Sequence, residues 1–201
     1  MEKLTEKVLR RLYTEVGLSD QGIASLYGVT RTSISYHRRK WGIVGKTSIS
    51  EKAIQDVQNE LERLGFTVEN KKKEDKHHIF DILVENTIRL DVRSTETLQE
   101  DTFRFKLVDS DNSCLEESIN RLQLKNGRTK KILRNTCDFV ILVGYLDGVP
   151  NFWVIPSQDL KDDLIGISIR PYSEISKYLE YADAWGRLRE TDKLHSISKL
   201  G

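Results

Sequence analysis

Residues 20–39, DQGIASLYGVTRTSISYHRR, predict two short helices joined by a tight turn. Small Ala24 lets the two helices cross at close range, and Gly28 supplies the positive φ that a short turn demands. Thr30 stands where a side-chain hydroxyl caps the start of the second helix. The remaining apolar positions are expected to pack between the helices, and they are Ile23, Val29 and Ile34.

This spacing is that of a helix-turn-helix, and a further helix is expected to complete it. Residues 4–16 predict an amphipathic helix, because their apolar side chains recur at helical intervals. Trp41 and Ile43 follow the motif and would close the core. Residues 1–45 are therefore expected to form a three-helix domain. The apolar face of its first helix consists of Leu4, Val8, Leu9, Leu12 and Tyr13.

The second helix of the motif is the part expected to meet double-stranded DNA. Side chains that point away from Ile34 would face the major groove, and basic side chains near the end of the helix would contact phosphates. A three-helix bundle used for protein contacts is the alternative. The predicted DNA-binding residues are Thr30, Arg31, Thr32, Ser35 and Tyr36, followed by Arg38, Arg39 and Lys40.

Charge is distributed unevenly along the 201 residues, although the formal net charge is only +1. Residues 1–46 carry nine Lys and Arg against four Asp and Glu, whereas residues 47–201 carry 23 against 27. A basic head on a mildly acidic body fits a nucleic-acid-binding module attached to a larger domain. We expect a linker at 46–50, a second domain at 51–190 and a loosely ordered tail at 191–201.

The sequence also favours a cytoplasmic protein. No run of 18 apolar residues occurs, and the N-terminus lacks the apolar centre of a signal peptide. Cys114 and Cys137 lack the spacing of a metal site, which favours a reducing compartment. We expect a soluble protein, bacterial or phage-encoded, that associates with the nucleoid.

The second domain is expected to open with a helix and a strand. Ser48 and Glu51 have the spacing of a capping box at the start of the helix, and Gly65 is expected to end it. A strand would follow from Phe66. The apolar face of the helix consists of Ile54, Val57, Leu61 and Leu64.

Residues 79–94, IFDILVENTIRLDVRS, predict a β-hairpin that turns at residues 85–87, after a charged loop at 70–78. Alternation along the first strand sets Asp81 apart from its apolar neighbours. In the second strand, Asp91 shares one face with Arg89 and Arg93. The two carboxylates converge if the strands pair in this register, whereas a slip of one residue separates them.

The rest of the chain predicts an α+β domain. CDFVILVGYL at 137–146 is nearly all apolar, which is typical of a strand buried on both faces. Four aromatic residues are expected in the core, namely Tyr145, Trp153, Tyr172 and Trp185. The other expected elements are strands at 103–108 and 151–157, a helix at 115–133 interrupted at Asn126–Gly127, and closing helices at 157–164 and 172–190.

This order of elements, with Asp81 followed by Asp91-Val92-Arg93, resembles the PD-(D/E)xK nuclease superfamily over about residues 50–156. The resemblance implies an α/β restriction-endonuclease-like domain with a mixed central sheet flanked by helices. The family motif ends in Lys, whereas this chain has Arg93. Arginine holds a phosphate well but, with a pKa above about 12, does not readily accept a proton.

The resemblance also implies a divalent metal. Phosphodiester hydrolysis needs charge neutralised at the phosphate and a water activated, which Mg²⁺ or Mn²⁺ held by carboxylates supplies. Asp81 and Asp91 would be the ligands, with the carbonyl of Val92 and Glu51 added by position in the family pattern. A capping role with Ser48 is the alternative for Glu51, and an Asp–Arg cluster is the alternative for the two aspartates.

Two lysines elsewhere in the chain are candidates for the role of the motif lysine. Lys106 on the next strand and Lys125 further on would be able to replace the motif lysine beside Arg93. A basic cluster in the body is either a solvated face or a phosphate contact. It consists of Arg128, Lys130, Lys131 and Arg134.

Three functions agree with these patterns. The first is a site-specific DNA endonuclease that uses Asp81, Asp91 and Arg93 for catalysis and serves restriction, homing or a mobile element. The second is a DNA-binding regulator or architectural protein whose nuclease-like domain is catalytically degenerate and dimerises. The third is an effector-controlled transcription factor with an apolar pocket. One helix-turn-helix reads few base pairs, so a homodimer is expected.

Overall fold

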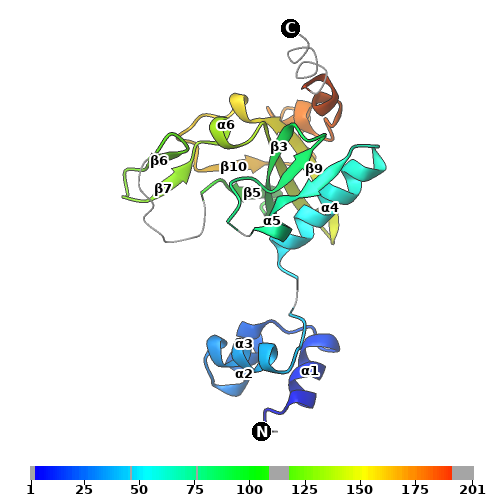
Figure 1. Ribbon diagram of the computed structural model, residues 1–201, viewed down its shortest axis with the longest axis vertical. Helices are drawn as coiled ribbons and strands as arrows, with labels where there is room; N and C mark the ends of the chain where they lie inside the picture. Colours follow the sequence, from blue (N-terminus) through cyan, green and yellow to red (C-terminus); the bar gives the residue numbers. More distant parts are fainter. Residues whose placement is uncertain (1–2, 46, 76, 109–117, 192–201) are drawn as a thin grey trace. The chain divides into compact units, whose positions relative to one another are not determined.

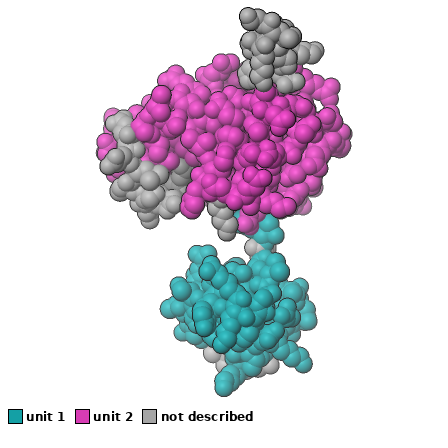
Figure 2. All heavy atoms as spheres, in the orientation of Figure 1, with its two compact units in different colours: residues 1–48 teal, residues 49–201 magenta. Residues whose placement is uncertain are grey.

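A computed structural model describes residues 3–45, 47–75, 77–108 and 118–191. The chain divides into two compact units, residues 1–48 and residues 49–201 (Figure 2). Cys114 and most of the expected tail, residues 192–201, lie outside the described residues. None of the described helices is long and apolar enough to cross a membrane.

The described residues of unit 1 form three helices, α1 (Glu6–Thr14), α2 (Asp20–Tyr27) and α3 (Arg31–Lys40). Each begins at a hydroxyl cap: the side chains of Thr5, Ser19 and Thr30 accept hydrogen bonds from backbone amides of the first turn. Gly28 closes α2 with φ of 64°, as the tight turn requires. The core between the helices contains Val8, Leu9, Leu12, Tyr13, Ile23, Ala24, Ile34 and Ile43.

Unit 2 is built on a mixed five-stranded sheet in the order β1-β2-β3-β8-β9 (Figure 1). Only β3 and β8 are parallel. Strand β8 lies between β3 and β9 and is buried over nearly its whole length, which explains its continuous apolar sequence. The strands are β1 (Val68–Asn70), β2 (Ile82–Val84), β3 (Ile88–Thr95), β8 (Phe139–Leu146) and β9 (Val149–Pro156).

Helix α4 (Ile49–Arg63) covers one face of this sheet. Its buried residues Ala53, Ile54, Val57 and Leu61 pack on the inward side chains of β2, β3 and β8. The hydroxyl of Tyr145 in β8 donates a hydrogen bond of 2.6 Å to the carboxylate of Asp56, which fixes the helix to the sheet. The apolar face expected for this helix is therefore the face that it buries against the sheet.

The other face is covered by a small sheet of three strands, in the order β10-β5-β4, and not by a layer of helices. Phe103 and Phe105 of β5 point toward the central sheet and meet Trp153 at ring-centroid distances of 6.0 Å. Gly144 of β8 lies under the Phe103 ring. The strands are β4 (Leu98–Gln99), β5 (Thr102–Lys106) and β10 (Gly166–Ile169).

The helix expected at 115–133 is wrong where the structure describes it. Strands β6 (Arg121–Gln123) and β7 (Thr129–Lys131) form a hairpin, followed by the short helix α6 (Leu133–Thr136). Asn126–Gly127 is the turn of this hairpin, and Gly127 adopts φ of 78°. The Asn-Gly pair signals a hairpin more strongly than three apolar residues at approximate helical spacing signal a helix.

The C-terminal part also departs from the expected helices. Residues 157–164 contain only the 3₁₀ turn η1 (Ser157–Asp159), and residues 172–185 contain turns and η2 (Leu179–Tyr181) before a helix at 186–191. Tyr172 is consequently exposed, whereas Tyr145, Trp153 and Trp185 are buried as expected. In the charged loop at 70–78, residues Lys71–Glu74 form the short helix α5, capped by the side chain of Asn70.

Candidate functional site

Asp81 and Asp91 lie side by side in unit 2. The hairpin register pairs Ile82 with Leu90, and the backbone amide of Asp81 donates to the carbonyl of Leu90. Asp81 Oδ2 then accepts a hydrogen bond of 2.6 Å from the amide of Val92, in the residue after Asp91. Both side chains are buried, with 7% of Asp81 and 1% of Asp91 exposed, so the hairpin brings two carboxylates into one enclosed place.

Three cationic side chains surround this pair. Arg93 Nε lies 2.5 Å from Asp91 Oδ1, and Lys131 Nζ lies 3.3 Å from Asp91 Oδ2. Lys72 Nζ of α5 approaches Asp81 Oδ1 to 3.8 Å. The amines of the two lysines are fixed by backbone carbonyls, since Lys131 donates to Ile79 and Lys72 to His78. The site therefore carries excess positive charge around two buried carboxylates.

The two aspartates differ in acidity. Burial, and then the negative charge of Asp91, raise the pKa of Asp81 to about 6 against the opposing effects of the Val92 amide, Lys131 and Lys72. Burial also acts to raise the pKa of Asp91, but Arg93 and Lys131 outweigh it and hold that pKa below its ordinary value. Asp91 is thus the permanent anion of the pair, and Asp81 is the carboxyl that gains a proton in mildly acidic solution.

Lys131 is the lysine that reaches Asp91, and Lys72 is the lysine that reaches Asp81. Lys106 and Lys125, the replacements expected for the motif lysine, are both exposed, and Lys125 lies in the β6–β7 turn. The rest of the expected basic cluster is dispersed: Arg134 pairs with Asp162, and buried Lys130 donates to the carbonyl of that residue. The signal for Lys131 in the sequence was its place in the basic run just before the buried strand.

The donor set fits a hard divalent cation through two carboxylates. Mg²⁺ is commonly held by one or two carboxylates together with water and substrate phosphate, and Asp81 and Asp91 provide two carboxylates here. Glu51 does not join them, because no three His, Cys, Asp or Glu side chains gather as a metal site within the described ranges. It is instead exposed in the first turn of α4. Any ion here would compete with Arg93 and Lys131 for the oxygens of Asp91.

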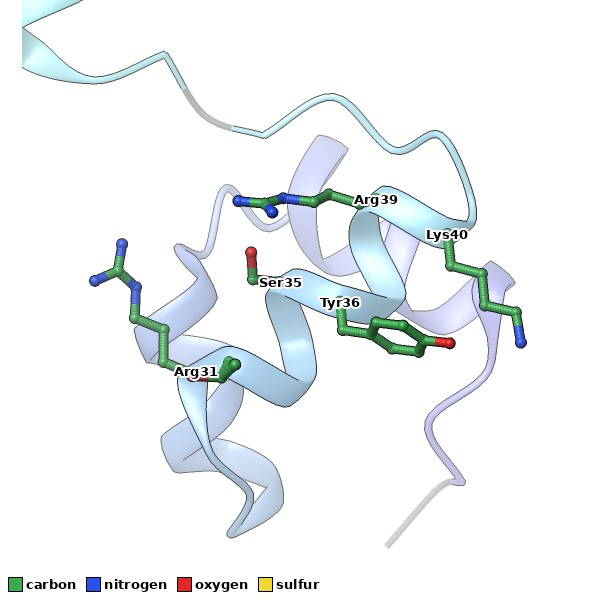
Figure 3. Close-up of a pocket in the computed structure, with 6 residues that line it drawn as sticks. Arg31, Ser35, Tyr36, Arg39 and Lys40 are labelled. Carbon is green, nitrogen blue, oxygen red and sulfur yellow. The ribbon is translucent and has the colours of Figure 1, made fainter. Parts of the chain in front are cut away.

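Unit 1 presents a separate polar face on α3. A shallow hollow of about 780 Å³ is lined by side chains of this helix, and Figure 3 shows Arg31, Ser35, Tyr36, Arg39 and Lys40 along it. The side chains of Arg31, Arg39 and Lys40 are exposed. The lining residues are Arg31, Thr32, Ser35, Tyr36, Arg39 and Lys40.

Arg38 has a structural role that the sequence reasoning missed. Its Nε and Nη2 atoms donate hydrogen bonds of 3.0 and 3.3 Å to the two carboxylate oxygens of Asp20. The guanidinium also lies 5.9 Å from the centroid of the Tyr13 ring. This side chain therefore ties α3 to α2 and α1, instead of extending toward solvent. Thr30 caps α3 through a hydrogen bond from the amide of Ser33, as its position in the sequence predicts.

Among known proteins, a solved structure has an architecture similar to that of this chain. No family model matches the chain, and no curated protein matches it either. Among solved structures, the bacterial homing endonuclease I-Ssp6803I is similar, with a TM-score of 0.53, 15% sequence identity, and coverage of 74% of this chain and 95% of the other. The chain has a nuclease-like fold. At that identity the likeness concerns the fold alone.

Proposed function

We propose that this protein is a metal-dependent, site-specific DNA endonuclease in which unit 1 binds double-stranded DNA and unit 2 cuts it. The observation that carries the proposal is the pair Asp81 and Asp91, buried side by side and surrounded by Lys72, Arg93 and Lys131. Two carboxylates suit a divalent cation, and several cations suit the phosphate on which it acts. The nuclease-like fold supports the same conclusion.

The residues divide the chemical tasks among themselves. Asp81 and Asp91 would hold Mg²⁺ or Mn²⁺, with the Val92 carbonyl as a further oxygen ligand, and the ion would supply Lewis-acid stabilisation at the phosphate. Arg93 would bind a phosphate oxygen through its planar fork. Lys131 would place a fixed positive charge where negative charge develops on the phosphate, and its contact with Asp91 keeps that charge in position.

The proposed DNA-binding role of unit 1 rests on the exposed face of α3. Three helices with a glycine turn before α3 have the order of a helix-turn-helix, and residues 1–46 carry an excess of five positive charges. Arg31, Thr32, Ser35 and Tyr36 would face the major groove, with Arg39 and Lys40 on the phosphates. We propose that a homodimer supplies two such faces, since one helix reads too few base pairs for useful specificity.

The experiment is cleavage of a DNA library by the full chain in Mg²⁺ or Mn²⁺, followed by mapping of the cut positions. Wild type should cut at a defined sequence, and Asp91→Asn should bind the same DNA without cutting it. Asp101→Asn is the matched control, because it makes the same exchange at an exposed loop position and should cut normally. Sequence-specific binding by wild type with no cleavage in either metal would refute the endonuclease proposal.

One observation favours a second function. Both oxygens of Asp91 already have cationic partners, and within the described residues no third acidic side chain completes a metal site. Such an arrangement also suits a DNA-binding regulator whose nuclease-like unit has become a structural or dimerisation domain. Wild type would then bind DNA, bind no Mn²⁺ in unit 2 and leave the DNA intact.

A further inference from the structure

The outer face of the small sheet in unit 2 is basic. Alternation along β5 buries Phe103 and Phe105 against the central sheet and turns Arg104 and Lys106 outward. Strand β10 lies beside it (Figure 1), with Ser168 directly opposite Arg104. Arg170 follows that strand and is also exposed. Three cations therefore stand on one small exposed surface.

Two hollows connect this surface to the site. The first, of about 540 Å³, contains Arg104, Arg170 and Lys177 together with hydroxyls from Ser168, Ser173 and Ser176. The second, of about 620 Å³, contains Arg104 and Lys106 on one side and Val92 and Arg93 on the other. Because Arg104 lines both, a continuous polar track leads from Arg93, beside the buried aspartates, across β5 to Lys177.

Among the described residues, the exposed cations of this track lack the carboxylate partners that other cations in unit 2 have. Elsewhere Arg63 pairs with Glu60, Arg89 with Asp138, and Arg187 with Glu180. In the described part of the chain, no carboxylate lies within salt-bridge distance of the four exposed cations of the track, which are Arg104, Lys106, Arg170 and Lys177.

Clustering these cations is electrostatically unfavourable when no anionic partner is bound. Like charges on neighbouring positions of a sheet repel, and unit 2 as a whole has more acidic than basic residues. Among the side chains that the structure describes, Glu96 and Glu100 are the only acidic ones lining the two hollows. An anionic partner that lies across the sheet would remove this repulsion. The arrangement of cations therefore favours binding of an anion over stabilisation of the free unit 2.

We propose that this face binds the phosphate backbone of the duplex beside the position where unit 2 cuts. The proposal rests on the endonuclease function and adds a second DNA contact, separate from the face of α3. Cations at alternate positions of a strand stand about 7 Å apart, a row that suits an extended chain of charges better than one isolated anion. Serine hydroxyls along the track provide further donors to phosphate oxygens.

The test is DNA binding by the full chain in metal-free buffer, with affinity measured by fluorescence anisotropy over a range of KCl concentrations. Each lost phosphate contact lowers the slope of log affinity against log salt by about 0.9. The variant Arg104→Gln/Arg170→Gln should therefore lose about two units of slope. Arg104→Lys keeps the charge and should retain the slope of wild type.

The matched control is Arg63→Gln/Arg187→Gln, which removes the same charge from two paired arginines outside the track. It should keep the slope of wild type. An unchanged slope for the Arg104/Arg170 variant, or an equal fall in both double variants, overturns the proposal. DNA cleavage is measured in a separate experiment. If wild type cuts DNA but the Arg104/Arg170 variant keeps its salt slope, only the proposed DNA-binding face is refuted. If the variant loses slope but wild type does not cut DNA, only the endonuclease proposal is refuted.

Discussion

Lys131 of β7 lies 3.3 Å from Asp91 of β3, although 40 residues separate them in sequence. The β6–β7 hairpin thus provides an amine beside the carboxylate where the motif-like segment itself provides only Arg93. The two cations are chemically different. Arginine keeps its proton under all ordinary conditions, whereas a lysine amine is a compact charge that is able to exchange one.

We expect Lys131→Met to reduce cleavage at least 100-fold while leaving DNA affinity nearly unchanged, because the lost charge acts mainly where the phosphate gains negative charge. Lys131→Arg should recover part of the rate, and Lys106→Met should cut more than 10-fold faster than Lys131→Met. Single-turnover cleavage rates at saturating enzyme measure the effect. Equal losses in the Lys131 and Lys106 variants would contradict a specific role for Lys131.

The raised pKa of Asp81 leads us to expect an unusual dependence of the free energy of unfolding on pH. Its pKa rises from 3.8 to about 6 on folding, so between about pH 4 and pH 6 the folded chain binds more protons than the unfolded chain. Its contribution to the free energy of unfolding therefore falls as pH rises through that range, by up to about 3 kcal/mol. Asp91, with its lowered pKa, contributes in the opposite direction and is lost at more acidic pH.

The variant Asp81→Asn isolates this contribution, because an amide resembles the protonated carboxyl. As the pH rises from 4 to 7, urea denaturation should show the free energy of unfolding of the variant increasing relative to that of wild type. A constant difference across that range would show that Asp81 titrates normally. Cleavage by wild type should in turn rise with pH near 6, where Asp81 becomes ionised and able to hold a cation.

Arg38→Ala is expected to lower the stability of unit 1. The substitution removes a two-point ion pair with Asp20, which is only 14% exposed at its side chain, and leaves that carboxylate without its partner. A loss of about 1–3 kcal/mol follows from hydrogen bonds to a charged group. Thermal unfolding measures it, and Asp20→Asn should produce a loss of similar size. Full stability in both variants would show that the pair contributes nothing.

Arg31→Ala and Arg39→Ala should act on DNA affinity instead. Both side chains are exposed on the α3 face and line the same hollow, so their removal should leave thermal stability within about 0.5 kcal/mol of wild type. Arg31→Ala should weaken binding to the preferred sequence more than to other sequences, whereas Arg39→Ala should weaken both equally. Unchanged affinity in both would show that α3 does not contact DNA.

The sequence was sufficient for elements with strong local signals. Apolar periodicity predicted α1, and the Gly28 turn with the Thr30 cap predicted α2 and α3. Alternation with a short turn predicted the β2–β3 hairpin, and of the registers that the sequence left open the structure has the one that places Asp81 beside Asp91. A single apolar run identified β8 as buried. In each case the pattern extends over several neighbouring residues, so local chemistry determines the structure.

The sequence was insufficient where contacts are distant or patterns short. Lys131 meets Asp91 through the β6–β7 hairpin, and neither of its three-residue strands shows clear alternation. Strand β10 has four residues in a segment otherwise rich in turns, and pairing with β5 reveals it only in the folded chain. Arg38 has the sequence environment of a phosphate-binding residue, and only the packing of α2 places Asp20 against it.

Gly144 of β8 links the packing between the two sheets to the basic face of β5. A Cβ atom at this residue would lie 2.7 Å from the Phe103 ring, so a larger side chain would have to displace that ring and with it disturb the packing of β5 on β8. Arg104 and Lys106 would move with the strand, while Asp81 and Asp91 belong to other strands. A substitution at Gly144 would therefore realign the proposed DNA contact without altering any group proposed to touch the duplex.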